Sequence, residues 1–307
     1  MPEASNSQRS RQAQQGCCPA ELITEAAAEL AAAGIENPRL DAEAMLAAAS
    51  HSSRVAVVSG LAEIDCAARE RYAAMAARRM RREPLAYILG CKEFYSLEFE
   101  VTSAVLIPRP ETETVVFAAL EFIKGHAKAR VLDLGTGSGA IALAIAANAP
   151  GAELTATDIS PEALTIARRN AARLSLGSRV QFRLADCFTP MDDLGQLGRF
   201  DLIVSNPPYI RDREIATLAP EISRYEPCAA LAGGPDGLEF YRRMGTALTE
   251  NLERDGSVIV EIADQSAAVN EIMRNAGATS IRVIPDLADL PRVVVAHFGS
   301  TNESFAR

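Results

Sequence analysis

The spacing of apolar residues in the first third of the chain is helical. Between residues 19 and 82, Leu22, Ala26 and Leu30 recur at every fourth position, which places them on one face of a helix. Pro38 interrupts this pattern, and a second segment with the same spacing follows it. The pattern predicts a small bundle of helices.

A short segment after the predicted bundle has the two-residue period of a strand. Residues 94–101 alternate apolar and polar side chains, as in a strand with one buried face. The apolar run at residues 85–89 precedes it across Gly90, and we expect the two segments to pair as a hairpin.

From residue 130 onward, strand-like and helix-like segments alternate. Seven strands are predicted, at residues 131–134, 154–157, 180–184, 202–205, 258–262, 280–284 and 292–298. Helices are predicted at 140–147 and 161–174, the second with Ser160 as N-cap and Pro161 at its first position. This alternation favours a doubly wound, mostly parallel α/β sheet. The short connection between the last two strands suits an antiparallel pair.

These patterns divide the chain into four predicted parts. They are a disordered tail at residues 1–18, a helical domain at 19–83, a β-hairpin linker at 84–108 and an α/β domain at 109–307.

Composition narrows the class of protein. Hydrophobic residues make up 48% and charged residues 23% of 307, which is typical of a soluble globular protein, and the apolar runs are too short for a membrane span. A net charge of −9 argues against direct binding of nucleic acid. The six cysteines and three histidines are too scattered for a metal site. We therefore expect no metal, and a cytoplasmic protein with reduced cysteines.

The four residues Asn206, Pro207, Pro208 and Tyr209 stand where the predicted strand 202–205 ends. Two prolines in succession stop a strand and stiffen the backbone. In an open α/β sheet, ligands bind at this carboxyl edge. An asparagine side chain beside a rigid carbonyl can hold a planar –NH2 group, so the segment indicates chemistry on an amide or amino nitrogen.

A glycine-rich turn follows the predicted strand 131–134. It consists of Gly135, Thr136, Gly137, Ser138 and Gly139. Glycines allow the backbone to turn tightly and to approach a ligand closely.

Acidic residues close the next two predicted strands. Asp158 ends the second, where a carboxylate can accept ribose hydroxyls. Asp186 ends the third, and its carboxylate, or the backbone of Cys187, can hold an adenine amine. With the glycine turn and Asn206, these residues indicate a site for S-adenosylmethionine in a class I methyltransferase.

Several segments together resemble one family, the release-factor glutamine N5-methyltransferases (PrmC/HemK family), over about residues 79–298. They are residues 82–90 (REPLAYILG), 106–113 (LIPRPETE), 132–139 (LDLGTGSG), 205–210 (SNPPYI), 225–227 (YEP) and 233–241 (GGPDGLEFY). The NPPY tetrapeptide alone also occurs in methyltransferases that act on DNA adenine or on ribosomes. Its combination with the IPRPETE segment is more specific.

The resemblance implies a Rossmann-like class I methyltransferase fold with a seven-stranded, mostly parallel sheet and a C-terminal antiparallel strand. It makes the helical N-terminal domain a substrate-docking domain. It also implies transfer of a methyl group from S-adenosyl-L-methionine, leaving S-adenosyl-L-homocysteine, to the GGQ glutamine of class I peptide chain release factors. The expected partners are release factors, with no nucleic acid and no membrane, and the expected state is a monomer.

Residue roles follow from the chemistry of an amide nitrogen. The Asn206 side-chain oxygen and the Pro207 carbonyl are predicted to accept its two N–H bonds. Tyr209 is predicted to form the wall of the pocket around the glutamine side chain, and Pro208 to stiffen it. Arg109, Glu111 and Glu113 either shape the mouth of the cofactor pocket or form a structural ion-pair cluster.

Other functions remain open from the sequence. The same chemistry suits a ribosomal-protein glutamine or a nucleic-acid amino group. A non-catalytic adaptor with a decayed site is a further alternative, which the intact glycine turn, Asp158 and NPPY disfavour.

The arginine cluster at residues 78–82 also has two interpretations. A solvated helix end that complements the helix dipole is favoured, and a contact for an acidic or RNA-bearing partner is the alternative.

Overall fold

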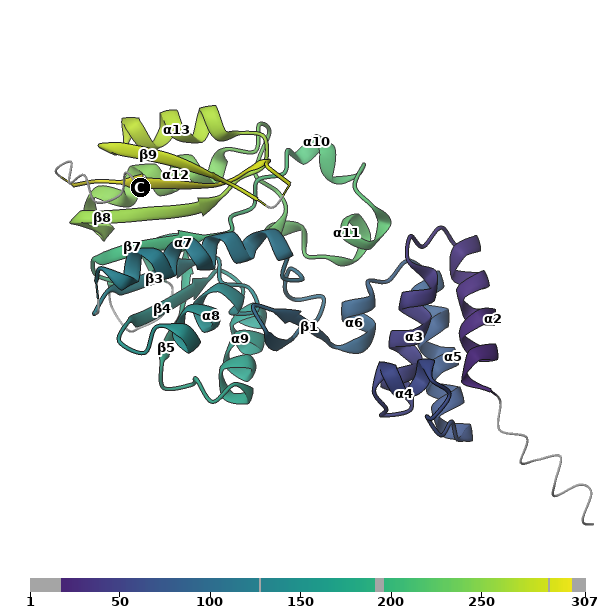
Figure 1. The fold of residues 1–307 in the computed structure, drawn as a ribbon. Coiled ribbons are helices and arrows are strands. Elements are labelled where there is room, and N and C mark those ends of the chain that lie inside the picture. The colour runs from purple at the N-terminus through teal and green to yellow at the C-terminus, as the bar shows by residue number, and fades with distance from the viewer. Residues whose placement is uncertain (1–17, 127, 191–195, 287, 300–307) are drawn as a thin grey trace, which may run out of the picture. The chain divides into compact units, whose positions relative to one another are not determined.

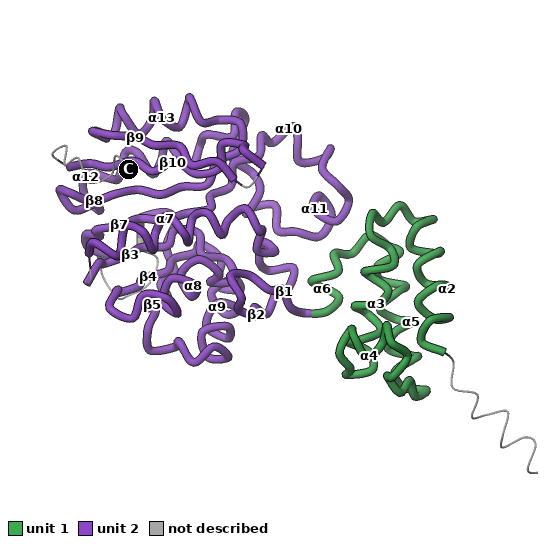
Figure 2. The backbone as a smooth tube through the Cα atoms, viewed as in Figure 1, with its two compact units in different colours: residues 1–89 green, residues 90–307 purple. Residues whose placement is uncertain are grey.

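The computed structural model describes residues 18–126, 128–190, 196–286 and 288–299. The chain divides into two compact units, residues 1–89 and 90–307 (Figure 2). Except for Cys18, the predicted tail lies outside the described residues, and the predicted domain boundaries at 83/84 and 108/109 remain predictions. Within the described ranges, no helix is long and apolar enough to cross a membrane.

The first unit consists of helices, as the apolar spacing predicts. They are α2 (Pro19–Ala32), α3 (Pro38–Ala49), α4 (Arg54–Val58), α5 (Cys66–Met80) and α6 (Leu85–Leu89). A proline begins both α2 and α3, where its missing N–H has no helical partner to lose. Asp65 caps α5 by accepting the Ala68 N–H at 2.6 Å. The apolar faces enclose a core of their own around Leu30, Met45 and Leu46.

The arginines at the end of α5 bind groups of their own unit. Arg79 is buried and donates to Asp41 at 2.7 Å, and Arg78 donates to Glu83 at 2.9 Å. Arg82 donates to the Gly34 carbonyl at 2.7 Å. The favoured interpretation of a solvated helix end is therefore wrong for Arg79.

Residues 85–89 form the helix α6 and not the predicted strand. A five-residue apolar run suits either structure, and Pro84 decides the outcome because its carbonyl accepts from the N–H groups of Tyr87 and Ile88.

The hairpin consists of β1 (Cys91–Phe94) and β2 (Leu97–Glu100), which pair antiparallel. Tyr95 and Ser96 make its two-residue turn, both at positive φ.

Besides the hairpin, the second unit contains an eight-stranded twisted sheet with the order β6-β5-β4-β3-β7-β8-β10-β9 (Figure 1). The strands are β3 (Arg130–Leu134), β4 (Glu153–Asp158), β5 (Val180–Asp186), β6 (Thr189–Pro190), β7 (Phe200–Ser205), β8 (Leu252–Glu261), β9 (Ser280–Pro285) and β10 (Pro291–His297). Neighbours from β5 to β8 are parallel, whereas β10 runs antiparallel to both β8 and β9. The seven predicted strands and the antiparallel C-terminal strand are confirmed, and the two-residue β6 is an addition.

Helices cover both faces of this sheet. They are α7 (Glu113–Lys124), α8 (Ala140–Asn148), α9 (Pro161–Arg173), α12 (Glu239–Asn251) and α13 (Ser266–Asn275). Short elements α10 (Asp212–Ile215), α11 (Pro220–Tyr225), η2 (Cys228–Ala230) and η1 (Pro110–Thr112) lie in the connections. The predicted cap of α9 is confirmed, because the Ser160 hydroxyl accepts the Ala163 N–H at 3.1 Å.

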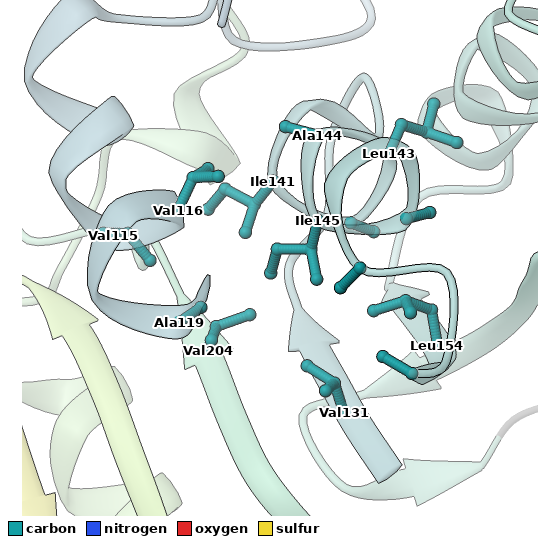
Figure 3. Packing of buried hydrophobic residues seen from close by; sticks show 14 of the residues in the cluster. Val115, Val116, Ala119, Val131, Ile141, Leu143, Ala144, Ile145, Leu154 and Val204 are labelled. Atoms are coloured by element: carbon teal, nitrogen blue, oxygen red, sulfur yellow. The ribbon is translucent and has the colours of Figure 1, made fainter. Parts of the chain in front are cut away.

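Alternate residues of each strand belong to different cores, as the two-residue period requires. Val131 and Val204 pack beneath α7 and α8, where Val116 lies beside Ile141 (Figure 3). Leu132 and Ile203 belong instead to the cluster that contains residues of α12 and α13. Because both faces are covered, the carboxyl ends of the parallel strands are left as the edge where a ligand can enter.

Candidate functional site

A cavity of about 510 Å³ lies at the carboxyl ends of β3, β4, β5 and β7. Nine of the predicted site residues line it: Gly135, Thr136, Gly137, Ser138, Asp158, Asp186, Cys187, Asn206 and Pro208. Gly139, Pro207 and Tyr209 do not line it. Gly139 instead starts α8, where a Cβ would lie 3.0 Å from Leu143 and 3.3 Å from Ala167.

The glycine turn leaves open space on the cavity side. A Cβ built on Gly135 or Gly137 would meet no atom within 4 Å, so the backbone there is available to a ligand. Asp158 holds the turn by accepting the N–H groups of Gly137 at 2.8 Å and Ser160 at 2.9 Å. Burial raises the pKa of the Asp158 carboxyl.

A second carboxyl group, that of Asp133, lies beneath the turn and is completely buried. One of its oxygens accepts from the Thr136 hydroxyl at 2.6 Å and from the Ala142 N–H at 3.2 Å. The other oxygen has no hydrogen-bond partner among the described residues. Burial therefore raises the pKa of Asp133 to about 7. Sequence analysis missed this residue, although an acidic side chain within an apolar strand is itself a signal.

The end of β5 offers a mixed polar and apolar surface. Asp186 pairs with Arg243 of α12 at 2.6 Å, and both side chains are about half exposed. Cys187 has a positive φ, and burial raises the pKa of its thiol to about 11. Ile159, which follows β4, lines the same cavity with 51% of its surface exposed. An exposed isoleucine in a cavity suits a flat apolar ligand group.

Asn206 belongs to a chain of hydrogen bonds that begins at two residues of the cavity lining, Asn206 and Thr112, and ends at the buried Glu261. The Asn206 Nδ2 donates to the Thr112 hydroxyl oxygen at 3.0 Å. The Thr112 hydroxyl donates to Glu261 Oε2 at 2.6 Å, and the Tyr209 hydroxyl donates to Glu261 Oε1 at 3.2 Å. Glu261 is 1% exposed, and burial raises the pKa of its carboxyl. Sequence reasoning missed both Thr112 and Glu261.

The backbone around Tyr209 is held by the segment at residues 228–237. Ile210 donates its N–H to the Leu231 carbonyl at 3.0 Å and accepts from the Gly233 N–H at 2.8 Å. The Gln265 side chain donates to the Tyr209 carbonyl at 2.8 Å. The GGPDG sequence therefore supports the segment that carries Asn206.

Arg109 and Glu113 act as structural ties. Arg109 donates to the buried Glu226 at 2.6 Å, which joins the 106–113 segment to the Tyr-Glu-Pro segment. Glu113 accepts the Tyr95 N–H at 2.9 Å and so holds the hairpin turn. Neither they nor Glu111 line the cavity, so the ion-pair interpretation fits Arg109 better than a place at the pocket mouth.

Among the described residues, no cluster of three or more His, Cys, Asp or Glu side chains could hold a metal ion.

Two protein families match the chain. The PrmC N-terminal domain matches residues 21–90, and a methyltransferase domain matches residues 125–303.

Curated relatives match most of the chain. The release factor glutamine methyltransferase of Caulobacter vibrioides is 42% identical over 86% of this chain and 90% of its own. That of Moorella thermoacetica is 41% identical over 90% of this chain and 97% of its own.

Among solved structures, the hMettl16 catalytic domain in complex with a MAT2A 3′UTR hairpin superposes with a TM-score of 0.54 at 20% identity. It covers 73% of this chain and 82% of that chain. At this identity the likeness concerns the fold alone.

Proposed function

Because the chain belongs to the release factor glutamine methyltransferase family, we propose that it methylates N5 of the glutamine in the GGQ motif of peptide chain release factors. The observation that carries the proposal is the placement of Asn206 in the cavity, with its amide nitrogen bound to Thr112. This leaves the amide oxygen as the group available to a substrate –NH2.

S-adenosyl-L-methionine is the methyl donor, and the residues of the cavity fit it. The open side of the glycine turn admits a ligand close to the backbone, and beneath that turn one oxygen of Asp133 has no hydrogen-bond partner among the described residues. Asp158 stands at a strand end where an acidic group accepts ribose hydroxyls, and Ile159 offers apolar surface to a base. When bound, this donor supplies an electrophilic methyl group.

We propose that the predicted residues around this cavity bind the methyl donor. They are Gly135, Thr136, Gly137, Ser138, Asp158, Asp186, Cys187 and Asn206, with Gly139 fixing the turn against α9. Because Asp186 already binds Arg243, the backbone at Cys187 is the better candidate for the adenine amine.

The protein's own task is to orient a poor nucleophile. The lone pair of an amide nitrogen is delocalised into its carbonyl, so the reaction depends on alignment rather than on binding alone. The Asn206 Oδ1 and the Pro207 carbonyl accept the two amide N–H bonds and favour the positive charge that develops there. Pro208, which lines the cavity, confines the glutamine side chain, and Tyr209 supports it from outside the cavity lining, where its hydroxyl donates to Glu261. A separate general base is not needed, because the methylated nitrogen can lose its proton to water after the transfer.

The test uses the purified protein with S-adenosylmethionine carrying a labelled methyl group. A purified release factor is expected to take up close to one label per molecule, and its GGQ glutamine-to-alanine variant none. Equal labelling of both factors would place the methyl group elsewhere, and no labelling of either would refute the proposed activity.

We further propose that the protein acts in the cytoplasm as a monomer and needs no nucleic acid. The net charge of −9 supports the last point, since phosphate binding requires clustered cations. Light scattering gives the mass in solution. Treatment of the assay with nuclease is expected to leave the rate unchanged, and a large loss of rate would contradict the proposal.

A further inference from the structure

We infer that Thr112 and Glu261 are positioning residues that fix which end of the Asn206 side chain faces the cavity. The inference rests on the proposed function, because it explains why the Asn206 amide oxygen, which the proposed reaction uses, faces the cavity. It concerns two residues that lie 149 positions apart in the chain.

The direction follows from counting hydrogens. A threonine hydroxyl has one hydrogen to donate, and Thr112 donates it to Glu261 at 2.6 Å, a length typical of a bond to a charged oxygen. The Thr112 oxygen can therefore only accept from its second neighbour. That neighbour is Asn206, which must turn its Nδ2, at 3.0 Å, toward Thr112.

The opposite direction would oppose the reaction. The two ends of an asparagine amide have nearly the same shape, so packing alone does not choose between them. A reversed Asn206 would present an N–H group to the N–H groups of the substrate glutamine. The hydrogen bond to Thr112 excludes this state and keeps Oδ1 for the substrate.

A carboxylate at position 261 suits this task because it can only accept. Glu261 receives hydroxyl hydrogens from both Thr112 and Tyr209, and the Tyr241 hydroxyl holds its backbone carbonyl at 2.7 Å. Arg292 adds a favourable charge interaction with the carboxylate, and Glu111 adds an opposing one. A glutamine here would place a donor against one of the two hydroxyls, so the charge sets the direction of the whole chain of bonds.

The first experiment compares Thr112→Val with Thr112→Ser in the full chain, using release factor methylation. The valine variant loses the hydroxyl but keeps the shape, and its kcat is expected to fall about 10- to 100-fold, the effect of a lost bond of this kind. Its KM for S-adenosylmethionine is expected to stay near wild type. Its melting temperature is expected to fall, because the buried Glu261 carboxylate loses one of its two hydroxyl donors, so the rates are measured at a temperature where both variants are folded. The serine variant is expected to keep its kcat within about threefold. Equal rates for the two variants would overturn the inference.

A second experiment reverses the direction of the bonds. In the double variant Asn206→Asp with Glu261→Gln, the Gln amide can donate to Thr112, whose hydroxyl then donates to the Asp carboxylate. The second Asp oxygen remains for the substrate, and the Gln oxygen still accepts from Tyr209. The double variant is expected to be at least about tenfold faster than Asn206→Asp alone. A double variant no faster than that single variant would overturn the inference.

A third measurement needs no methyl transfer and so separates this inference from the proposed function. The side-chain NH2 group of Asn206, identified by the signal lost in Asn206→Ala, is observed by ¹⁵N NMR. Its bonded hydrogen is expected to exchange with solvent at least about tenfold faster in Thr112→Val than in wild type. An unchanged exchange rate would overturn the inference. If wild type fails to label release factors while this exchange result holds, only the proposed function fails.

Discussion

Two buried carboxyl groups, Asp133 and Glu261, lie on the two strands that flank β7 in the sheet. Both oxygens of Glu261 receive hydroxyl hydrogens, whereas one oxygen of Asp133 has no partner among the described residues. A buried charge is stable only when it is fully hydrogen-bonded. Of the two carboxyl groups, Asp133 is therefore the one more readily protonated in the folded chain.

This difference predicts a pH dependence of stability that Asp133→Asn removes. The pKa of Asp133 is about 7 in the folded chain and about 3.9 in an unfolded one. Between these values the folded chain holds a proton that the unfolded chain has released, so its stability falls as the pH rises. From pH 5 to pH 8, wild type is expected to lose roughly 2 to 3 kcal/mol relative to the variant.

Urea unfolding of both proteins at pH 5, 6.5 and 8, without the methyl donor, measures this difference. A gap between the two proteins that stays constant with pH would show that Asp133 remains ionised in the folded chain.

Asn206→Ala tests the proposed acceptor directly. The variant loses the oxygen that accepts a substrate N–H, so turnover on a release factor is expected to fall roughly 100-fold or more. Affinity for S-adenosylmethionine, measured by calorimetry, is expected to change little, because many other residues line the cavity. Near-normal turnover of this variant would refute the role assigned to Asn206.

At the scale of elements, the segment at residues 228–237 decides where the Asn206-to-Tyr209 segment lies. It binds Ile210 from both sides through backbone hydrogen bonds. Gly237 passes so close that a Cβ there would lie 2.4 Å from the Tyr209 carbonyl oxygen, and its φ is +77°. This position therefore requires glycine for two reasons, the contact and the backbone conformation.

Gly237→Ala is expected to be more harmful than Gly277→Ala, which serves as the matched control. Gly277 also has a positive φ, of +102°, but a Cβ there would meet nothing within 4 Å. The control is expected to lose about 1 to 2 kcal/mol from backbone strain alone, and Gly237→Ala about 1 to 3 kcal/mol more from the clash. Denaturant unfolding measures the stabilities.

Turnover separates the two variants further, because only Gly237→Ala shifts the Tyr209 carbonyl. Similar turnover in the two variants would mean that the Tyr209 segment tolerates the displacement.

Most elements of the α/β sheet were predictable from sequence. Short apolar runs between helix-like segments predicted the seven strands, and Pro161 after Ser160 predicted the start of α9. The two-residue period at residues 94–101 was misleading, because Tyr95 and Ser96 form a turn within that segment. The run at residues 85–89 was too short to show a period, so α6 was not predictable.

The hydrogen-bond partners of the site residues were also not predictable from sequence, because they are distant in the chain. Arg243, for example, lies 57 positions from its partner Asp186. Such pairs form only when the helices pack against the sheet, and a local sequence pattern does not predict that packing.

At the scale of the whole molecule, the chain consists of two units (Figure 2). Each unit has its own buried hydrophobic core. The residues that line the cavity all belong to the second unit. A unit with its own core is expected to fold alone. Binding of the methyl donor and the predicted docking of the protein substrate on the first unit can therefore be tested separately.

A chain restricted to residues 90–307 is expected to bind S-adenosylmethionine within about threefold of the full chain's affinity, since its cavity is complete. Its turnover on a release factor is expected to fall at least about tenfold, because the predicted docking surface is missing. Calorimetry and the labelling assay measure the two quantities. Full turnover by the shortened chain would show that the first unit does not dock the substrate.

The place of β10 in the sheet has a consequence for biosynthesis. The ribosome makes β8 and β9 first, yet β10 lies between them, and its Val293 is the register partner of Glu261. Until β10 has emerged, β8 lacks a neighbour on that side, so Glu261 has no strand beside it. Long-range pairing of this kind forms late in folding. A nascent chain that stalls before β10 therefore carries Asn206, Thr112 and Glu261 but lacks the strand that pairs with β8 beside Glu261, so we expect Asn206 to be held in place only after β10 has paired.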